Sequence, residues 1–223
     1  MTDQYSLEHL WMPFSANRDF KSSPRLMNEA EGMYYKKQDG TPVLDGTAGL
    51  WCCNAGHSNK KIVDAIHQQV RKLDYAPSFQ MGHPLGFEAA QKLLQIAPSN
   101  DFQYVFFTNS GSESVDTALK IALGYQQHLG NSEKKILIGR NRSYHGVGFG
   151  GISVGGLPYN KNHFSLLPNV DHICDMHFEN SIFHRYRICL ILHYQYHSNS
   201  FFLNSDLLFF SIYIFYNFFL MYS

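Results

Sequence analysis

Hydrophobic residues recur at helical spacing in several stretches of the chain. Residues 60–74, KKIVDAIHQQVRKLD, place an apolar stripe on one helix face, and Ser58 or Asn59 is available as the N-cap. Residues 87–98, FEAAQKLLQIAP, repeat the pattern, and Pro98 is expected to end that helix because proline cannot continue it. Both segments therefore predict amphipathic helices.

The middle of the chain alternates short apolar runs with a third helical pattern. Residues 103–108, QYVFFT, predict a short buried strand, and residues 134–140, KKILIGR, predict another. The helix between them is expected from Ser112 to about Leu129, stopping at Gly130, with four buried side chains: Val115, Leu119, Ala122 and Leu123. Strand, helix and strand in this order predict an α/β fold with a parallel, right-handed crossover.

A tight turn joins the first predicted strand to the third helix. The strand would end at Thr108 and deliver Ser110, Gly111 and Ser112 to the carboxyl edge of the sheet. Unpaired backbone N–H groups and the positive end of the helix dipole meet there, which makes the turn a suitable seat for a phosphate. A capping role for Ser110 or Ser112, with Glu113 favouring the dipole, explains the same residues. The turn alone leaves both interpretations open.

A glycine-rich run offers a competing motif. Residues 146–151, GVGFGG, match the dinucleotide-binding pattern G-x-G-x-x-G, and Asp171 lies 20 residues after Gly151, the last glycine of the run. The pattern requires a helix after the glycines, and the sequence that follows, ISVGGLPYN, does not predict one. A nicotinamide-dependent oxidoreductase is therefore kept as a distant alternative.

Composition and charge narrow the possible functions. The net charge is zero, so no basic excess exists to bind nucleic acid. The four cysteines form no C-x-x-C pair, and the twelve histidines have no metal-ligand spacing, so no metal site is expected. Asp3 and the absence of a long apolar core near the N-terminus argue against a secretory signal. We therefore expect a cytoplasmic protein with reduced thiols.

The last 45 residues, 179–223, differ from the rest of the chain. They contain no Gly, Ala, Val, Pro, Thr or Lys, whereas Phe, Tyr, Leu and Ile supply 25 of the 45. Globular segments need turn residues, so we interpret this aromatic-rich tail as the product of a frameshift or read-through. The alternative is a tail-anchored membrane protein, although the apolar run from Leu207 to Tyr222 has 16 residues, fewer than the roughly 20 that a span needs.

Several motifs carry a family resemblance from about Leu7 to about His172. They are HLWMPFSANRDF, EAEGMYY, DGTAGLWCCNAGH, LDYAPSFQMGHPLGFEAAQKL, VFFTNSGSESVDTALKIA and LIGRNRSYHGVGFGGISVGG. In order and spacing they resemble the N-terminal half of the class III, pyridoxal-phosphate-dependent aminotransferases. Within that class they most resemble the omega-amino acid:pyruvate, or beta-alanine:pyruvate, aminotransferases.

The resemblance implies a fold, a cofactor and roles for particular residues. The fold is the fold-type I transferase fold, truncated to part of the large domain with its parallel-type sheet and an N-terminal piece of the small domain. The cofactor is pyridoxal 5'-phosphate, with its phosphate on Ser110, Gly111 and Ser112. Tyr144 would stack on the pyridine ring of the cofactor. His145, the next residue of the same motif, is also implied to contact the cofactor. The implied substrate pocket contains three aromatic residues: Phe14, Trp51 and Phe79. Ordinary core packing is the alternative for these three.

The resemblance also implies boundaries and an activity. Residues 1–58 would form the N-terminal segment of the small domain and pocket, and residues 59–178 the first half of the large domain. Full-length members are homodimers that transfer an amino group from a small-molecule amine to a keto acid. The lysine that binds the cofactor belongs to the second half, and residues 179–223 contain no lysine. We therefore expect no catalytic residue here and an inactive, non-catalytic or pseudogene fragment, whose dimerisation is in doubt.

Overall fold

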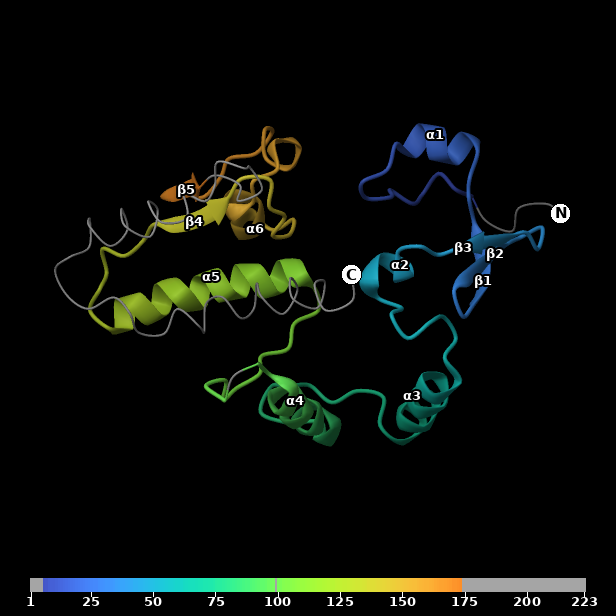
Figure 1. The fold of residues 1–223 in the computed structure, drawn as a ribbon, viewed down its shortest axis with the longest axis horizontal. Coiled ribbons are helices and arrows are strands. Elements are labelled where there is room, and N and C mark those ends of the chain that lie inside the picture. Colours follow the sequence, from blue (N-terminus) through green and yellow to red (C-terminus); the bar gives the residue numbers. More distant parts are fainter. Residues whose placement is uncertain (1–5, 99, 174–223) are drawn as a thin grey trace. The chain divides into compact units, whose positions relative to one another are not determined.

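The computed structural model describes residues 6–98 and 100–173, which divide into two compact units, Met1–Phe87 and Glu88–Ser223 (Figure 1). The first unit contains α1 (Asn17–Ser22), β1 (Met27–Glu31), β2 (Tyr34–Lys37), β3 (Pro42–Leu44), α2 (Ala48–Trp51) and α3 (Lys60–Lys72). Helix α4 (Pro84–Ile96) spans the division. The second unit continues with α5 (Gly111–His128), β4 (Leu137–Arg140), α6 (Phe149–Val154), a 3-10 turn (Pro158–Asn160) and β5 (Val170–Ile173).

The first unit is built on a small antiparallel sheet with the strand order β1-β2-β3. Gly32 and Gly40 stand in the two connecting turns with φ values of 57° and 82°, which favour glycine. An isolated bridge between Gly32 and His57 ties the turn after β1 to the segment after α2. Residues far apart in the sequence are thereby joined at one end of the sheet.

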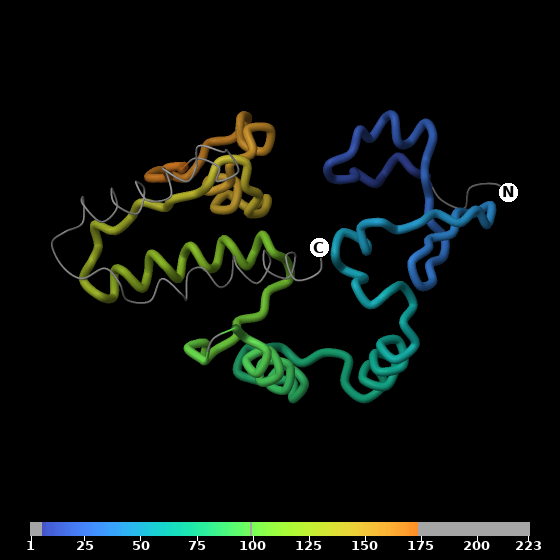
Figure 2. Tube along the Cα trace, viewed as in Figure 1, coloured from blue at the N-terminus to red at the C-terminus, as the bar shows by residue number. Residues whose placement is uncertain are grey.

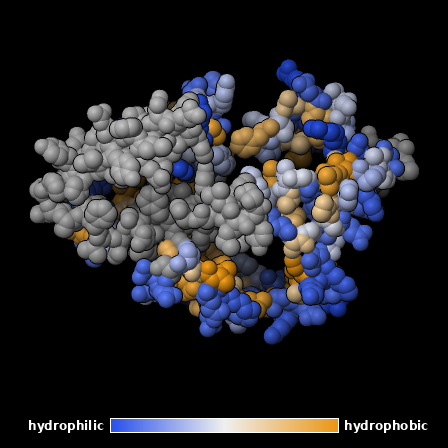
Figure 3. Space-filling model, viewed as in Figure 1, coloured by the Kyte–Doolittle hydropathy of each residue, from blue (hydrophilic) through white to orange (hydrophobic). Residues whose placement is uncertain are grey.

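The two amphipathic helices form where the sequence predicts them. Helix α3 starts after Asn59, whose side chain accepts a hydrogen bond from the Lys61 N–H at 3.1 Å, so the predicted cap is confirmed. Helix α4 begins at Pro84, three residues before the expected start, because proline suits the first turn of a helix. Neither helix buries a residue within the described part of the chain. Figure 3 accordingly shows hydrophobic side chains at the surface over α3 and α4.

The second unit packs α5 and α6 against a two-stranded parallel sheet of β4 and β5. Its core contains side chains from one face of α5, from α6 and from both strands: Val115, Leu119, Val154, Leu137 and Val170. The predicted burial of Val115, Leu119 and Ala122 is confirmed. Leu123 was expected to be buried, but 36% of it is exposed because it lies at the edge of the stripe.

The predicted strand at residues 103–108 is wrong in this structure. The segment has no strand assignment, and Tyr104 and Phe106 are 89% and 71% exposed. Figure 2 shows it as the connection that leads into α5. A strand needs a hydrogen-bonding neighbour, and β4 pairs with β5 among the described residues. The parallel connection observed is therefore β4-α6-β5. The expected connection, from residues 103–108 through α5 to β4, comes earlier in the sequence.

The aromatic-rich tail, including Leu207–Tyr222, lies outside the described residues, as do Cys174 and Cys189. Within the described ranges, no helix is both long and apolar enough to cross a membrane. The boundary expected near residue 58 stays a prediction.

Candidate functional site

The N-terminus of α5 is closed by a local hydrogen-bond network. The Ser110 hydroxyl oxygen accepts a hydrogen bond from the Glu113 N–H at 3.1 Å, which confirms the predicted cap. The Glu113 carboxylate reaches back and accepts the Asn109 N–H at 2.9 Å. Accepting a bond leaves the Ser110 O–H free to donate to a ligand. Capping and ligand binding by Ser110 are therefore compatible.

Ser112 connects α5 to a loop that lies 35 residues later in the chain. Its hydroxyl oxygen accepts a hydrogen bond from the Val147 N–H at 3.0 Å. The neighbouring Gly146 has a φ of 110°, and a Cβ at that position would lie 2.7 Å from the Ser112 Cα. Glycine is required by both the backbone conformation and the close contact. The structure thus brings the Ser-Gly-Ser turn and the Tyr144–Gly146 loop together.

Two backbone donors remain available at this helix end. Among the described residues, no acceptor bonds the N–H of Gly111 or of Ser112. Both residues are only half-buried, so an anion can reach them. Backbone N–H groups at the positive end of an 18-residue helix favour a phosphate. The geometry fits a phosphate group.

The glycine-rich run serves packing in this structure. The sequence predicts no helix after it, which is wrong, because α6 begins within the run at Phe149. The Asp116 carboxylate of α5, however, accepts the Gly151 N–H at 2.8 Å and already occupies this helix end. A Cβ at Gly148 would lie 2.3 Å from that carboxylate. The glycines let α6 approach α5, so this arrangement gives no support to a dinucleotide site.

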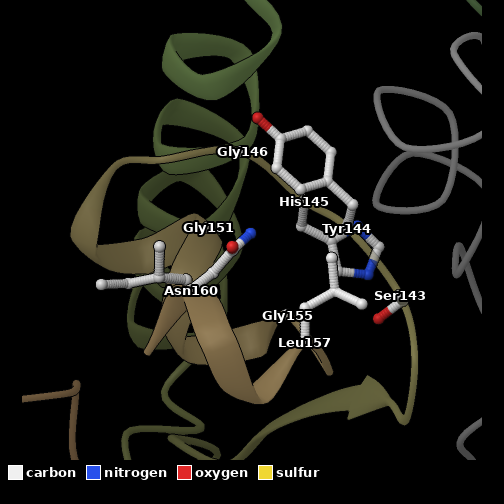
Figure 4. Close-up of a pocket in the computed structure, with 9 residues that line it drawn as sticks. Ser143, Tyr144, His145, Gly146, Gly151, Gly155, Leu157 and Asn160 are labelled. Atoms are coloured by element: carbon white, nitrogen blue, oxygen red, sulfur yellow. The ribbon is translucent and has the colours of Figure 1, made fainter. Parts of the chain in front are cut away.

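A shallow pocket lies beside the same loop. Figure 4 shows Ser143, Tyr144 and His145 on the loop between β4 and α6, with Leu157 and Asn160 on the segment after α6. The Tyr144 side chain is 56% exposed, so its ring is open to a ligand. The empty volume between these residues, which includes space open to solvent, is about 160 Å³. These residues line a small, open hollow beside Ser112, and their role in binding stays a prediction.

His145, on the same loop, is half-buried. Burial lowers the pKa of His145, and the positive charge of Arg140 and the ring of His172 lower it further. The lowered pKa favours the neutral imidazole.

The three predicted pocket aromatics lie in the first unit and are exposed: Phe14 at 82%, Trp51 at 56% and Phe79 at 80%. Core packing, the alternative explanation, does not describe them here. Phe14 and Trp51 have positive φ values of 51° and 69°, and Gln80, next to Phe79, has 62°. Strained backbone of this kind gathers at functional sites. Their place in a substrate pocket stays a prediction.

The role of Asp116 and the contact of Gly146 with Ser112 were not predicted from the sequence. Asp116 lies one helical turn after Ser112, on the face that α6 covers. That spacing is a local signal for Asp116. The Gly146 contact joins residues 34 positions apart, and nothing in the local sequence indicates it.

Comparison with known proteins shows to which protein family the chain belongs. A model of the aminotransferase class-III family matches residues 15–187. The chain belongs to this family. This class-III chain is 56% identical over 172 residues to an omega-aminotransferase of Caulobacter vibrioides, covering 77% of the chain and 39% of that protein. It is 45% identical over 173 residues to a beta-alanine–pyruvate aminotransferase of Pseudomonas aeruginosa, covering 78% of the chain and 38% of that protein.

Solved structures agree with the family. An omega-transaminase of Pseudomonas jessenii in complex with PMP matches with a TM-score of 0.77 and 29% identity, over 86% of the class-III chain and 45% of its own. A PLP-bound amine transaminase from an uncultivated Pseudomonas species matches with a TM-score of 0.76 and 28% identity, over 84% and 45%. The class-III chain thus spans less than half the length of these relatives. The predicted fold, a partial fold-type I α/β transferase, and the family's cofactor, pyridoxal 5'-phosphate, are confirmed.

Proposed function

We propose that this chain supplies the phosphate seat and a ring contact for pyridoxal 5'-phosphate in an omega-amino acid:pyruvate aminotransferase. The observation that carries the proposal is the 3.0 Å hydrogen bond between Ser112 and Val147, which joins the α5 N-terminus to the Tyr144 loop. Both segments can contact one ligand because Gly146 allows their close approach.

Ser110, Gly111 and Ser112 would hold the phosphate. The N–H groups of Gly111 and Ser112 point their partial positive charge at it, and the two hydroxyls donate their free protons. Accepted bonds from Glu113 and Val147 already orient these hydroxyls at 3.1 and 3.0 Å, so little rotamer freedom is lost when the phosphate binds.

Tyr144 would lie against the pyridine ring. Its exposed ring can stack on a flat heterocycle, and such a contact adds about 0.5 to 1.5 kcal/mol beyond burial. The bound cofactor supplies the electron sink on which amino transfer depends. The protein residues bind it, orient it and keep one side of its ring covered.

The substrates we propose are a small amine such as beta-alanine and the keto acid pyruvate. The names of the relatives from Pseudomonas aeruginosa and Pseudomonas putida support this choice. Phe14, Trp51 and Phe79 would provide exposed apolar surface for the carbon chain of the donor. As in the family, assembly as a homodimer is part of the proposal.

Turnover requires a lysine that reaches the cofactor, and no lysine of this chain stands in a matching family motif. We propose that the 223-residue chain binds the cofactor without catalysing transfer. The proposed experiment therefore measures binding and does not rely on activity.

Equilibrium dialysis of the full chain with pyridoxamine 5'-phosphate and with pyridoxamine tests the phosphate seat. Neither compound has the aldehyde that would react with surface lysines. We expect the phosphorylated form to bind at least about tenfold more tightly, since charge-assisted hydrogen bonds contribute roughly 1.5 to 3 kcal/mol.

The variant Ser112→Ala should remove most of that preference, whereas Ser132→Ala, on an exposed loop, should keep it. Equal binding of the two compounds to the unmodified chain would contradict the proposal. An unchanged preference in Ser112→Ala would contradict the role of this hydroxyl.

A further inference from the structure

A shielded pair of hydrogen-bonded polar side chains, Asp45 and His57, lies in the first unit, away from the residues of the phosphate seat in the sequence. The Asp45 carboxylate and the His57 Nε2 atom are 2.7 Å apart, and their side chains are 4% and 10% exposed. No residue among 6–87 is classed as buried as a whole, so this polar pair is unusually well shielded for its surroundings. A shielded carboxylate needs several hydrogen bonds to offset its desolvation.

The Asp45 carboxylate receives those bonds from the turn that follows it. One oxygen accepts the Thr47 N–H and hydroxyl, both at 3.1 Å, and the other accepts the Gly49 N–H at 2.7 Å and His57. Burial raises the pKa of Asp45, but the bonds from His57, Thr47 and Gly49 outweigh it and lower the pKa to about 2. Asp45 is therefore a carboxylate at neutral pH.

The turn that Asp45 holds is a left-handed one. Four consecutive residues of α2 have positive φ: Ala48 at 49°, Gly49 at 58°, Leu50 at 54° and Trp51 at 69°. For non-glycine residues this conformation costs roughly 1 to 2 kcal/mol each, so surrounding contacts must hold it. The Trp51 N–H donates to the Thr47 carbonyl at 3.0 Å, which places the tryptophan directly on the turn.

His57 connects the turn to the sheet. Its backbone exchanges two hydrogen bonds with Gly32, at 2.8 and 3.0 Å. Its ring lies 4.4 Å from the Tyr35 ring of β2, measured between centroids. A continuous chain of contacts therefore runs from β2 through His57 and Asp45 to Trp51.

We propose that Asp45 and His57 are positioning residues that lock the left-handed turn and thereby fix where the Trp51 ring stands. His57 donates through Nε2 to the carboxylate, and the carboxylate holds the N–H groups of Thr47 and Gly49. The importance of Trp51 for the amine substrate rests on the proposed function. The lock itself does not, because it uses no cofactor.

Fluorescence of Trp51 in the full chain tests the lock. The chain has two tryptophans, Trp11 and Trp51, so the variant Trp11→Phe leaves Trp51 as the single tryptophan. In this background we expect Asp45→Ala and His57→Leu to lower the anisotropy of Trp51 and to raise its acrylamide quenching severalfold. His57→Gln keeps a side-chain N–H donor and should restore a large part of the original values.

Asp64→Ala is the matched control. It removes a partner of the exposed Lys60–Asp64 pair, which has a similar N···O distance of 2.6 Å in the same unit. We expect no change of Trp51 there. Values for Asp45→Ala equal to those of the control would overturn the lock, and equal losses in His57→Gln and His57→Leu would overturn the role of the donated bond.

Limited chymotrypsin digestion at nanomolar concentration separates a loosened turn from an unfolded unit. Cleavage after Trp51 should accelerate in Asp45→Ala, while cleavage after Tyr34 in β2 should keep its rate. Equal acceleration at both sites would mean loss of the whole sheet and would overturn a positioning role. Because no cofactor is present, failure here leaves the phosphate seat untouched, and failure of the dialysis experiment leaves the lock untouched.

Discussion

Around α5, the shielded side chains are mainly apolar: Val115, Leu119 and Val154 contact one another, with the hydrogen-bonded Ser153 of α6 as a polar exception. Around α2, the shielded side chains are Asp45 and His57, and the neighbouring helix α3 buries no residue. Apolar contact has no preferred direction, so it stabilises α5 and α6 without dictating a particular turn. Hydrogen bonds are directional, so the carboxylate can hold a strained backbone in place.

The difference matters for the two proposed features, the phosphate seat in the second unit and the Trp51 turn in the first. The phosphate seat is a regular helix end, and its precision comes from close packing at Gly146. The Trp51 turn departs from regular structure and depends on one ionised group. The second should therefore respond to acid.

The largest expected effect is a loss of core packing in the second unit. Leu119→Ala should lower the free energy of unfolding by about 2 to 4 kcal/mol, because it opens a cavity between α5 and the sheet. Ile66→Ala in α3, at a residue 55% exposed, should cost less than about 0.5 kcal/mol. Urea unfolding followed by circular dichroism compares them. Equal losses would mean that α3 is packed as tightly as α5.

Two glycines of the second unit, Gly139 and Gly124, test how closely its elements pack. A Cβ at Gly139 would lie 2.0 Å from the Val154 carbonyl oxygen, so Gly139→Ala should cost about 1 to 3 kcal/mol. Gly124 in α5 has nothing within 4 Å of its added Cβ, and Gly124→Ala should stabilise by about 0.5 to 1 kcal/mol. Thermal unfolding of the two variants measures the difference. A stable Gly139→Ala protein would show that α6 and β4 can move apart.

The smallest expected effect on the whole chain is a local response to acid. The pKa of Asp45 is lowered from 3.8 to about 2, so the folded turn binds fewer protons than the unfolded one between these values. Its contribution is complete above about pH 4 and is lost as the pH falls towards 2. Quenching of Trp51 in the Trp11→Phe background should rise over this window. The phosphate-seat variant Ser112→Ala should leave that rise unchanged, and a flat Trp51 profile would argue against the lock.

Local signals in the sequence predicted the three long helices, α3, α4 and α5, but missed α1, α2 and α6. Asn59 and Ser110 cap helices through atoms two or three residues away, so nearby sequence suffices to find them. The buried face of α5 follows from the spacing of Val115, Leu119 and Ala122. The motifs between Leu7 and His172 correctly indicated the class-III aminotransferase family.

Contacts between distant residues were decided by the tertiary structure. Residues 103–108 have the composition of a strand, yet they lack a pairing partner among the described residues. The contacts of Ser112 with Val147 and of Asp45 with His57 also depend on the tertiary structure, because the arrangement of loops and strands brings these distant residues together. The sequence by itself determined α3, α4 and α5, the caps of α3 and α5, and the family, because these depend on neighbouring residues and on shared motifs. Only the tertiary structure decided which polar groups meet, because hydrogen bonds require positions that local propensity does not specify.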